Sequence, residues 1–251
     1  MSRKPTTRID EFLVSAGHAD SLIAARALIM AGEVIVDDQR VDKVGVQVSP
    51  ASQVRLKSQR FVSRGGDKLF HLIQDAKLED WIKDKIVMDV GSSTGGFTDC
   101  CLSLGARKVF AVDVGFNQLA WKLRQDDRVT VMEETDIRSI DASNFPAIDL
   151  IVADLSFISI RSILSSLRRL CTTDKTKFVV LIKPQFEVPK EQLPKGGVVA
   201  SDEVRTAIKD EIVDIMAHEG FLTLGTKDSQ IHGRRGNREI FVYGNFQIKQ
   251  G

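Results

Sequence analysis

The chain has 251 residues, and its 35 Lys and Arg against 34 Asp and Glu leave a formal net charge of +1, which by itself indicates no polyanionic partner. Three cysteines without metal-ligand spacing favour a reducing compartment, and the first residues lack the apolar core of a secretory signal. No apolar run approaches the ~20 residues that a membrane helix needs. These features predict a cytoplasmic protein with no membrane partner, built as one large domain or two unequal ones.

Residues 1–60 predict a small α+β domain. Apolar residues at helical spacing predict a first helix over 9–16, capped by Thr6 or Thr7, and a second helix over 21–31. Short strands follow at 34–36 and between 41 and 56. This is too little core for a catalyst, but it can form a docking face.

The pattern Arg8-Ile9-Asp10-x-Phe12-Leu13, continued over 21–36 by Ser-x4-Arg-Ala-Leu-Ile-x2-Gly-x-Val-x-Val, resembles the small RNA-binding domain first known from ribosomal protein S-four. We expect Arg8 and Arg26 on the exposed sides of their helices, where guanidinium groups can pair with phosphates. The alternative is that both are ordinary solvated arginines.

Residues 61–66 are predicted to be a linker, within the basic and glycine-rich run 58–66, and Arg64 in this strap could touch nucleic acid. From residue 67 to 251 the pattern predicts a second domain. A helix from Asp67 is followed by strands at 86–90, 108–112, 129–132, 149–153, 177–182, near Leu222 and at 239–243, with helices between most of them. That alternation predicts a parallel doubly wound α/β sheet with an antiparallel C-terminal hairpin, as expected of Rossmann-like methyltransferases.

The most informative motif is the turn after the first of these strands. It lacks the second glycine of a dinucleotide-binding fingerprint, and Phe97 stands where a phosphate-binding loop has its lysine. A glycine-rich turn with no cation favours a cofactor of little negative charge, such as S-adenosylmethionine. The candidate cofactor-binding residues in this run are Asp89, Gly91, Ser92, Ser93, Thr94, Gly95, Gly96 and Phe97. The alternative is a tight turn in an α/β core.

Polar residues also follow the other strands, where ligands of open α/β sheets bind. Asp113 is placed to accept hydrogen bonds from ribose hydroxyls, and Asp136 could meet the adenine amino group. Asp154 and Lys183 end the next two strands. If the last strand is antiparallel, Glu239 at its start faces the same crevice, which Lys68 could also reach. We therefore predict a site with two lysines and two carboxylates beside the cofactor.

Such a set suits methyl transfer to a ribose 2′-hydroxyl, which must lose its proton as the methyl group arrives. A lysine can accept that proton if its pKa is lowered by desolvation or by a neighbouring cation. The second lysine supplies that charge, and the carboxylates orient both amines. No metal is needed, and the four histidines show no ligand spacing.

Four motifs resemble the Lys-Asp-Lys-Glu tetrad of FtsJ-type ribose 2′-O-methyltransferases: Ser-Arg-Gly-Gly-Asp-Lys ending at Lys68, Asp-Leu-Ser-Phe from Asp154, Lys-Pro-Gln-Phe-Glu from Lys183, and Arg-Gly-Asn-Arg-Glu ending at Glu239. Together with the motifs of the N-terminal domain, these motifs span almost the whole chain. The chain therefore resembles the hemolysin A (TlyA) family of rRNA methyltransferases. The resemblance implies S-adenosylmethionine-dependent methylation of cytidine 2′-hydroxyls in ribosomal RNA, with rRNA or ribosomal subunits as partner and no obligate protein partner.

Two loops are expected to contact RNA. Residues 189–199 could cover the substrate, and the basic run 232–238 brings Arg234 and Arg235 next to Glu239. Two other functions stay open. The first is a non-catalytic RNA-binding ribosome-assembly factor that keeps the fold as a scaffold, and the second, which the sequence favours less, is a hemolysin acting on membranes. The complete Lys-Asp-Lys-Glu set argues against a scaffold, which has no need of paired buried charges.

Overall fold

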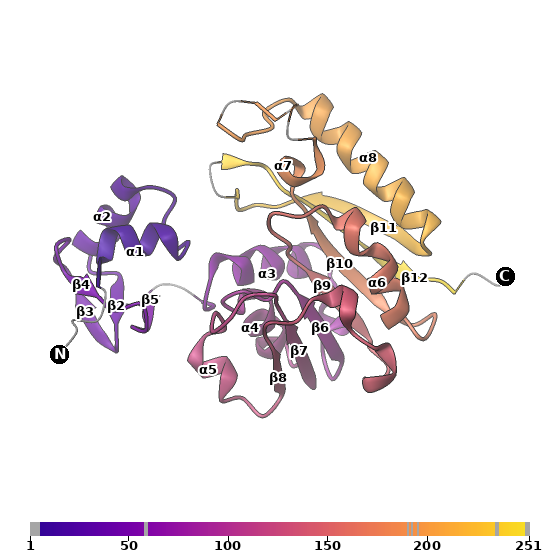
Figure 1. Cartoon of the computed structure of the whole chain (residues 1–251), viewed down its shortest axis with the longest axis horizontal. Helices are drawn as coiled ribbons and strands as arrows, with labels where there is room; N and C mark the ends of the chain where they lie inside the picture. Colours follow the sequence, from indigo (N-terminus) through magenta and orange to yellow (C-terminus); the bar gives the residue numbers. More distant parts are fainter. Residues whose placement is uncertain are drawn as a thin grey trace. The chain divides into compact units, whose positions relative to one another are not determined.

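The computed structural model describes residues 6–57, 60–189, 191, 193–194, 196–233 and 236–248. The chain divides into two compact units, Met1–Arg64 and Gly65–Gly251, and Figure 1 shows the elements of each. We call them the N-terminal unit and the C-terminal unit.

The N-terminal unit combines two helices with short strands. The elements are β1 (Thr7–Arg8), α1 (Ile9–Ser15), α2 (Leu22–Met30), β2 (Val34–Val36), β3 (Gln39–Val41), β4 (Gln47–Val48) and β5 (Val54–Leu56). Strand β2 pairs antiparallel with β3 and β5, and β1 pairs with β4. Ile9, Leu13 and Ile29 are fully buried and join the helices to the sheets in one core. Ser21 caps α2, since its Oγ accepts the N–H of Ala24 at 3.1 Å.

Two predicted boundaries are wrong. Thr7 does not cap α1, because it pairs with Val48 in β1, and the N-cap residue Arg8 makes no side-chain capping hydrogen bond. The helix expected from Asp67 begins earlier, at Arg64, so half of the segment expected as a linker is helical. Gly66 and Lys68 are buried within this helix, and such packing outweighs the low helix propensity of glycine.

The C-terminal unit is a seven-stranded sheet in the order β11-β12-β10-β9-β6-β7-β8. Its strands are β6 (Ile86–Val90), β7 (Lys108–Val112), β8 (Val129–Met132), β9 (Leu150–Ala153), β10 (Lys177–Ile182), β11 (Phe221–Asp228) and β12 (Ile240–Phe246). Its α-helices are α3 (Arg64–Ala76), α4 (Gly96–Ser103), α5 (Trp121–Arg124), α6 (Leu164–Leu170), α7 (Pro184–Glu187) and α8 (Asp202–His218). Short 3-10 turns lie at η1 (Glu79–Trp81), η2 (Ile137–Ser139), η3 (Ala142–Asn144) and η4 (Ile160–Ile163).

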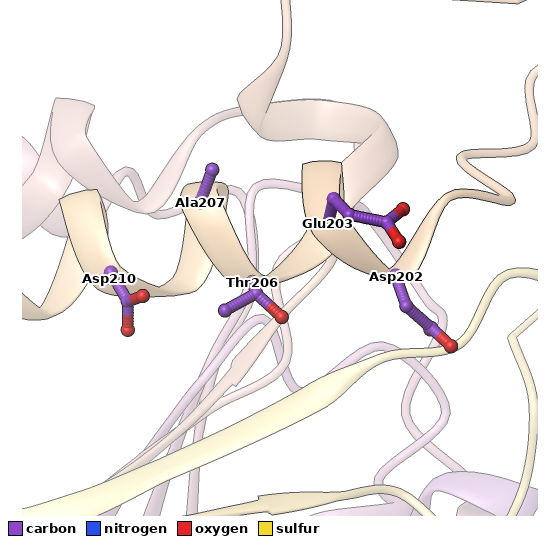
Figure 2. A pocket seen from close by; sticks show the side chains of 5 residues that line it. All are labelled: Asp202, Glu203, Thr206, Ala207 and Asp210. Atoms are coloured by element: carbon purple, nitrogen blue, oxygen red, sulfur yellow. The ribbon is translucent and has the colours of Figure 1, made fainter.

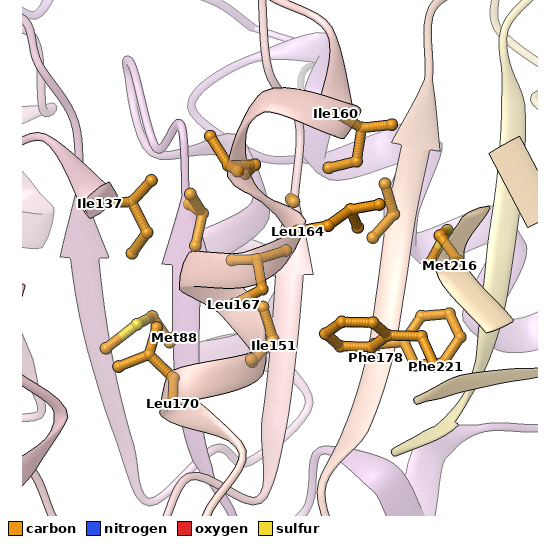
Figure 3. Close-up of a cluster of buried hydrophobic side chains, with 14 of the residues drawn as sticks. Met88, Ile137, Ile151, Ile160, Leu164, Leu167, Leu170, Phe178, Met216 and Phe221 are labelled. Atoms are coloured by element: carbon orange, nitrogen blue, oxygen red, sulfur yellow. The ribbon is translucent and has the colours of Figure 1, made fainter. Parts of the chain in front are cut away.

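Helices cover both faces of this sheet. On one face, side chains of α6 and α8, such as Leu167 and Met216, pack on Ile151 and Phe178 of the strands (Figure 3). On the other, Phe97 of α4 stacks on Phe241 of β12 with ring centroids 6.3 Å apart. The strands between them are almost wholly apolar, as expected of a parallel sheet buried on both faces.

The directions of the strands confirm the predicted fold class. Strands β6 to β10 pair in parallel, whereas β12 runs antiparallel to β10 and β11. Ile182, the last residue of β10, pairs with Ile240, the first of β12. The residue before β12 therefore lies at the edge where the parallel strands end, together with the residues that follow β9 and β10.

Candidate active site

The glycine turn joins β6 to α4 and exposes bare backbone. Gly91 and Gly95 have φ angles of +83° and +94°, which glycine adopts far more easily than other residues. A Cβ on Gly91 would lie 2.9 Å from the backbone oxygen of Asp154. The turn thus requires glycine and adjoins Asp154. Gly96 begins α4, and the ring of Phe97 is buried and stacks on Phe241.

Asp89 is fully buried beside this turn. Its Oδ2 accepts a hydrogen bond from Thr98 Oγ1 at 2.6 Å, while its Oδ1 has no partner among the described residues. Burial raises the pKa of Asp89 to about 7, against the opposing effect of the Thr98 hydrogen bond. The Ser92 hydroxyl is also buried, and it too has no partner within the described part of the chain. Such groups indicate where a polar ligand or water completes the hydrogen bonding.

The two further carboxylates predicted for the cofactor have different surroundings. Asp113 follows β7 and accepts the N–H groups of Ser93 at 2.8 Å and Gly115 at 2.7 Å, which ties the glycine turn to the next loop. Asp136 caps η2 and forms an ion pair with Arg138 at 2.5 Å. Hydrogen bonds from Arg138 lower the pKa of Asp136 to about 2. An adenine contact by this carboxylate therefore competes with Arg138.

Glu133 has a structural role that the sequence analysis missed. It follows β8 and accepts backbone N–H groups from three successive residues, Asn117, Gln118 and Leu119, at 2.7 to 3.0 Å. It also forms an ion pair with Arg124. Burial acts to raise its pKa, but these hydrogen bonds lower it to about 2. Glu133 thus fixes the loop after Asp113, and its place directly after a strand was the signal that could have revealed it.

The four residues of the predicted tetrad form two ion pairs at the edge where the parallel strands end. Lys68 on α3 contacts Glu239, with Nζ and Oε2 2.6 Å apart, and Lys183 contacts Asp154, with Nζ and Oδ1 2.7 Å apart. Lys68, Lys183 and Glu239 are buried. Elements far apart in sequence thus bring two cations and two anions to one place.

Electrostatics links the two pairs. Burial acts to raise the pKa of Asp154, but the charge of Lys183, and next that of Lys68, lowers it below its usual range. Lys68 therefore acts on Asp154 while its own hydrogen bond goes to Glu239. The four groups behave as one cluster, in which each buried charge is offset by an opposite one.

Side chains around Lys183 add three features that the sequence analysis did not single out. Its amine donates to Ser156 Oγ at 2.8 Å, in addition to its ion pair with Asp154. Phe157 is 85% exposed and has a φ of +70°, which is strained for an aromatic residue. Its ring lies 5.4 Å from that of Phe186. Periodicity cannot reveal a left-handed backbone at a non-glycine residue.

The segment before Glu239 is held from several sides. Asn237 is buried and binds the other predicted loop, since its Oδ1 accepts the N–H of Val199 and its Nδ2 donates to the carbonyl of Gly197. Gly233 leaves no room for a side chain, because a Cβ there would lie 2.2 Å from Glu239 Oε1. The carboxylate position thus depends on the loop's backbone.

The arginines predicted to bind RNA differ in how the structure constrains them. Arg8 and Arg26 both bind Asp10, and their side chains are 43% and 46% exposed. Arg64, at the end of the N-terminal unit, forms an ion pair with Asp20 at 2.6 Å. Arg234 and Arg235 lie outside the described residues.

A separate pocket runs along α8 and is lined by Asp202, Glu203, Thr206, Ala207 and Asp210 (Figure 2). None of these belongs to the glycine turn or the ion pairs. Three carboxylates in the lining would repel RNA phosphates, so we assign the pocket no part in the chemistry. The described residues include no group of three side chains able to hold a metal ion.

Comparisons with known proteins give matches over almost the whole chain. Residues 61–246 match the family model of FtsJ-like methyltransferases, and residues 7–54 match that of the S4 domain. The chain is 41% identical to YqxC of Bacillus subtilis, assigned as an rRNA methyltransferase, over 240 residues that cover 94% of this chain and 84% of that protein. It is 37% identical to the 16S/23S rRNA (cytidine-2′-O)-methyltransferase TlyA of Mycobacterium tuberculosis, over 240 residues that cover 94% of this chain and 88% of that protein. A solved structure from Streptococcus thermophilus, assigned to the hemolysins, has a TM-score of 0.84 at 36% identity and covers 97% of this chain and 89% of its own.

Proposed function

We propose a reaction on the premise that this chain belongs to the FtsJ-like methyltransferase family and, within it, to the TlyA (hemolysin A) rRNA methyltransferases. The chain transfers a methyl group from S-adenosylmethionine to the 2′-hydroxyl of a cytidine in ribosomal RNA. The observation that carries this proposal is the cluster of two buried ion pairs, Lys68–Glu239 and Lys183–Asp154, next to the glycine turn.

The residues of the turn fit S-adenosylmethionine. The orphaned oxygens of Asp89 and Ser92 offer acceptors to a polar, cationic ligand, and Asp113 keeps lone pairs for ribose hydroxyls. No lysine or arginine occurs between Asp89 and Phe97, as suits a cofactor without phosphates. When bound, S-adenosylmethionine supplies a methyl group on a positively charged sulfur. The carboxylates near the turn favour that charge.

Lys183 is the general base in this proposal. Its amine lies at the end of a buried strand and is oriented by Asp154 and Ser156, whereas Lys68 is engaged by Glu239. In its uncharged form the Lys183 amine accepts the proton that the 2′-hydroxyl loses on methylation. General-base assistance of this kind is typically worth ~10²–10⁴-fold in rate.

Substrate contacts follow from the surfaces around the cluster. The exposed ring of Phe157, next to Phe186 and close in sequence to Asp154, offers a face on which an unstacked base can lie. Arg8, Arg26 and Arg64 in the N-terminal unit, together with Arg234 and Arg235, are proposed to contact the RNA backbone. Residues 189–199 are proposed to cover the bound nucleotide.

The test is transfer of labelled methyl from S-adenosylmethionine to unmodified ribosomal subunits, followed by nucleoside analysis of the RNA. We expect label in 2′-O-methylcytidine, a loss of at least ~100-fold in Lys183→Ala, and little change in Lys209→Ala, a control on α8 whose amine pairs with Asp210. Cofactor binding, measured by calorimetry, should persist in both variants. Label on a base would keep the cofactor and discard the tetrad chemistry. No label, with cofactor bound, would favour the scaffold.

Membrane lysis is the activity that the hemolysin name suggests. In the part of the chain that the structure describes, no helix combines the length and the apolar character needed to cross a bilayer. The buried ion-pair cluster favours the methyltransferase over this alternative.

A further inference from the structure

Asp10 is a buried acid of the N-terminal unit that pairs with two arginines. It lies in the first turn of α1 and is fully inaccessible to solvent. Its carboxylate accepts hydrogen bonds from Arg8 through Nε and Nη2, both at 3.0 Å, and from Arg26 Nε, also at 3.0 Å. One anion therefore holds two guanidinium groups that come from different elements, the end of β1 and the middle of α2.

The two arginines keep donors for a ligand. A guanidinium group carries more N–H donors than a single carboxylate can accept, and both side chains remain almost half exposed. The three groups together carry a net positive charge. The hydrogen bond from Arg8, with that from Arg26, lowers the pKa of Asp10 to about 2, so the carboxylate stays ionised at physiological pH.

The fixed conformation of the two arginine side chains matters for phosphate binding as much as their charge does. A free arginine side chain loses considerable rotamer entropy when it binds a phosphate. Asp10 imposes that order during folding, and it fixes the distance between the two guanidinium groups. Phosphates favour such preoriented, forked donors.

We propose that Asp10 is a positioning residue for RNA binding, which holds Arg8 and Arg26 as one paired clamp for the phosphate backbone. The proposal rests on the proposed function, because that function names RNA as the substrate. It makes a prediction opposite to simple electrostatics. By charge alone, removing an acid next to two arginines should strengthen the binding of a polyanion. If Asp10 orders the two arginines, its removal should instead weaken RNA binding.

The experiment compares full-length Asp10→Asn with wild type in binding unmodified ribosomal RNA transcripts, measured by fluorescence anisotropy over a range of salt concentrations. Asp38→Asn is the matched control, since Asp38 also pairs with an arginine, Arg55, at 3.1 Å, but its side chain is 87% exposed. We expect Asp10→Asn to bind about 10-fold more weakly, and Asp38→Asn to bind as wild type or slightly more tightly. The rate of methyl transfer at saturating RNA should be unchanged in the control Asp38→Asn.

Two additional variants guard against a folding defect in Asp10→Asn. Arg8→Lys and Arg26→Lys keep the net charge but lose the forked geometry, and each should weaken RNA binding several-fold. RNA affinity that is equal or higher in Asp10→Asn, or unchanged in both lysine variants, overturns the clamp. Failure of the proposed function looks different: wild type would then bind cofactor and RNA yet transfer no methyl group.

Discussion

Replacing Asp89 with Asn tests the electrostatics of the glycine turn. The carboxyl group has an ordinary pKa of 3.8 in the unfolded chain and about 7 in the folded one, mainly because burial disfavours its charge. Between these values the folded chain holds a proton that the unfolded chain has lost. The free energy of unfolding therefore falls as pH rises, and above pH 7 the accumulated penalty is about 4 kcal/mol.

The penalty grows by about 2–3 kcal/mol between pH 5 and pH 8, from the same two pKa values. Asp89→Asn cannot titrate, and its amide oxygen can still accept the hydrogen bond of Thr98. The difference in unfolding free energy, variant minus wild type, should thus rise by that amount over this range. Urea denaturation at several pH values, followed by the near-UV signal of the C-terminal unit, measures it.

Asp210→Asn serves as the control, because Asp210 is an acid on α8 whose side chain is 62% exposed. Its difference from wild type should stay within about 0.5 kcal/mol at every pH. A constant offset between Asp89→Asn and wild type across the range would show that Asp89 is ionised in the folded chain, and the account of the turn given above would be wrong.

Three further substitutions test the cluster and its surroundings. Gly233→Ala puts a Cβ 2.2 Å from Glu239 Oε1, so kcat should fall at least about 10-fold while calorimetry finds cofactor affinity unchanged. Ser156→Ala removes one acceptor from the Lys183 amine, which should lower kcat about 10-fold and alter the pH–rate profile, and Ser156→Thr should restore both. Phe157→Ala should raise KM for RNA about 5- to 50-fold, with recovery in Phe157→Tyr; an unchanged KM would rule out stacking on this ring.

Periodicity and strand ends were sufficient to predict most of the C-terminal unit. The apolar runs that form β7, β8 and β10 have the predicted bounds, because a strand buried on both faces reads as an uninterrupted apolar segment. The antiparallel hairpin followed from a missing helix between the last two strands. Its register then places Glu239 at the edge where the parallel strands end, since Ile240 pairs with Ile182.

Contacts between segments that are distant in the chain could not be predicted from the sequence. Asp10 reads as an ordinary acid in a first helical turn, and only the fold shows that it is buried beneath two arginines. The place of Glu133 directly after a strand is a signal of a role, but only the fold shows which loop it holds through backbone N–H groups. Thr7 has a good capping side chain, but strand pairing decides its conformation instead.

Sheet register explains why the glycine turn and Lys183 lie close together. Ala153 pairs with Val90 on one side and with Val180 on the other, so Asp154 is held between the strand that leads into the glycine turn and the strand that leads to Lys183. A slip of one residue in β9 would turn Asp154 to the opposite face and leave Lys183 buried without its counter-charge. The fully buried apolar side chains of β9 oppose such a slip, because they would lose their packing on both faces. The hydrophobic core thus fixes the position of the glycine turn, the proposed place of the methyl donor, relative to Lys183, the proposed proton acceptor.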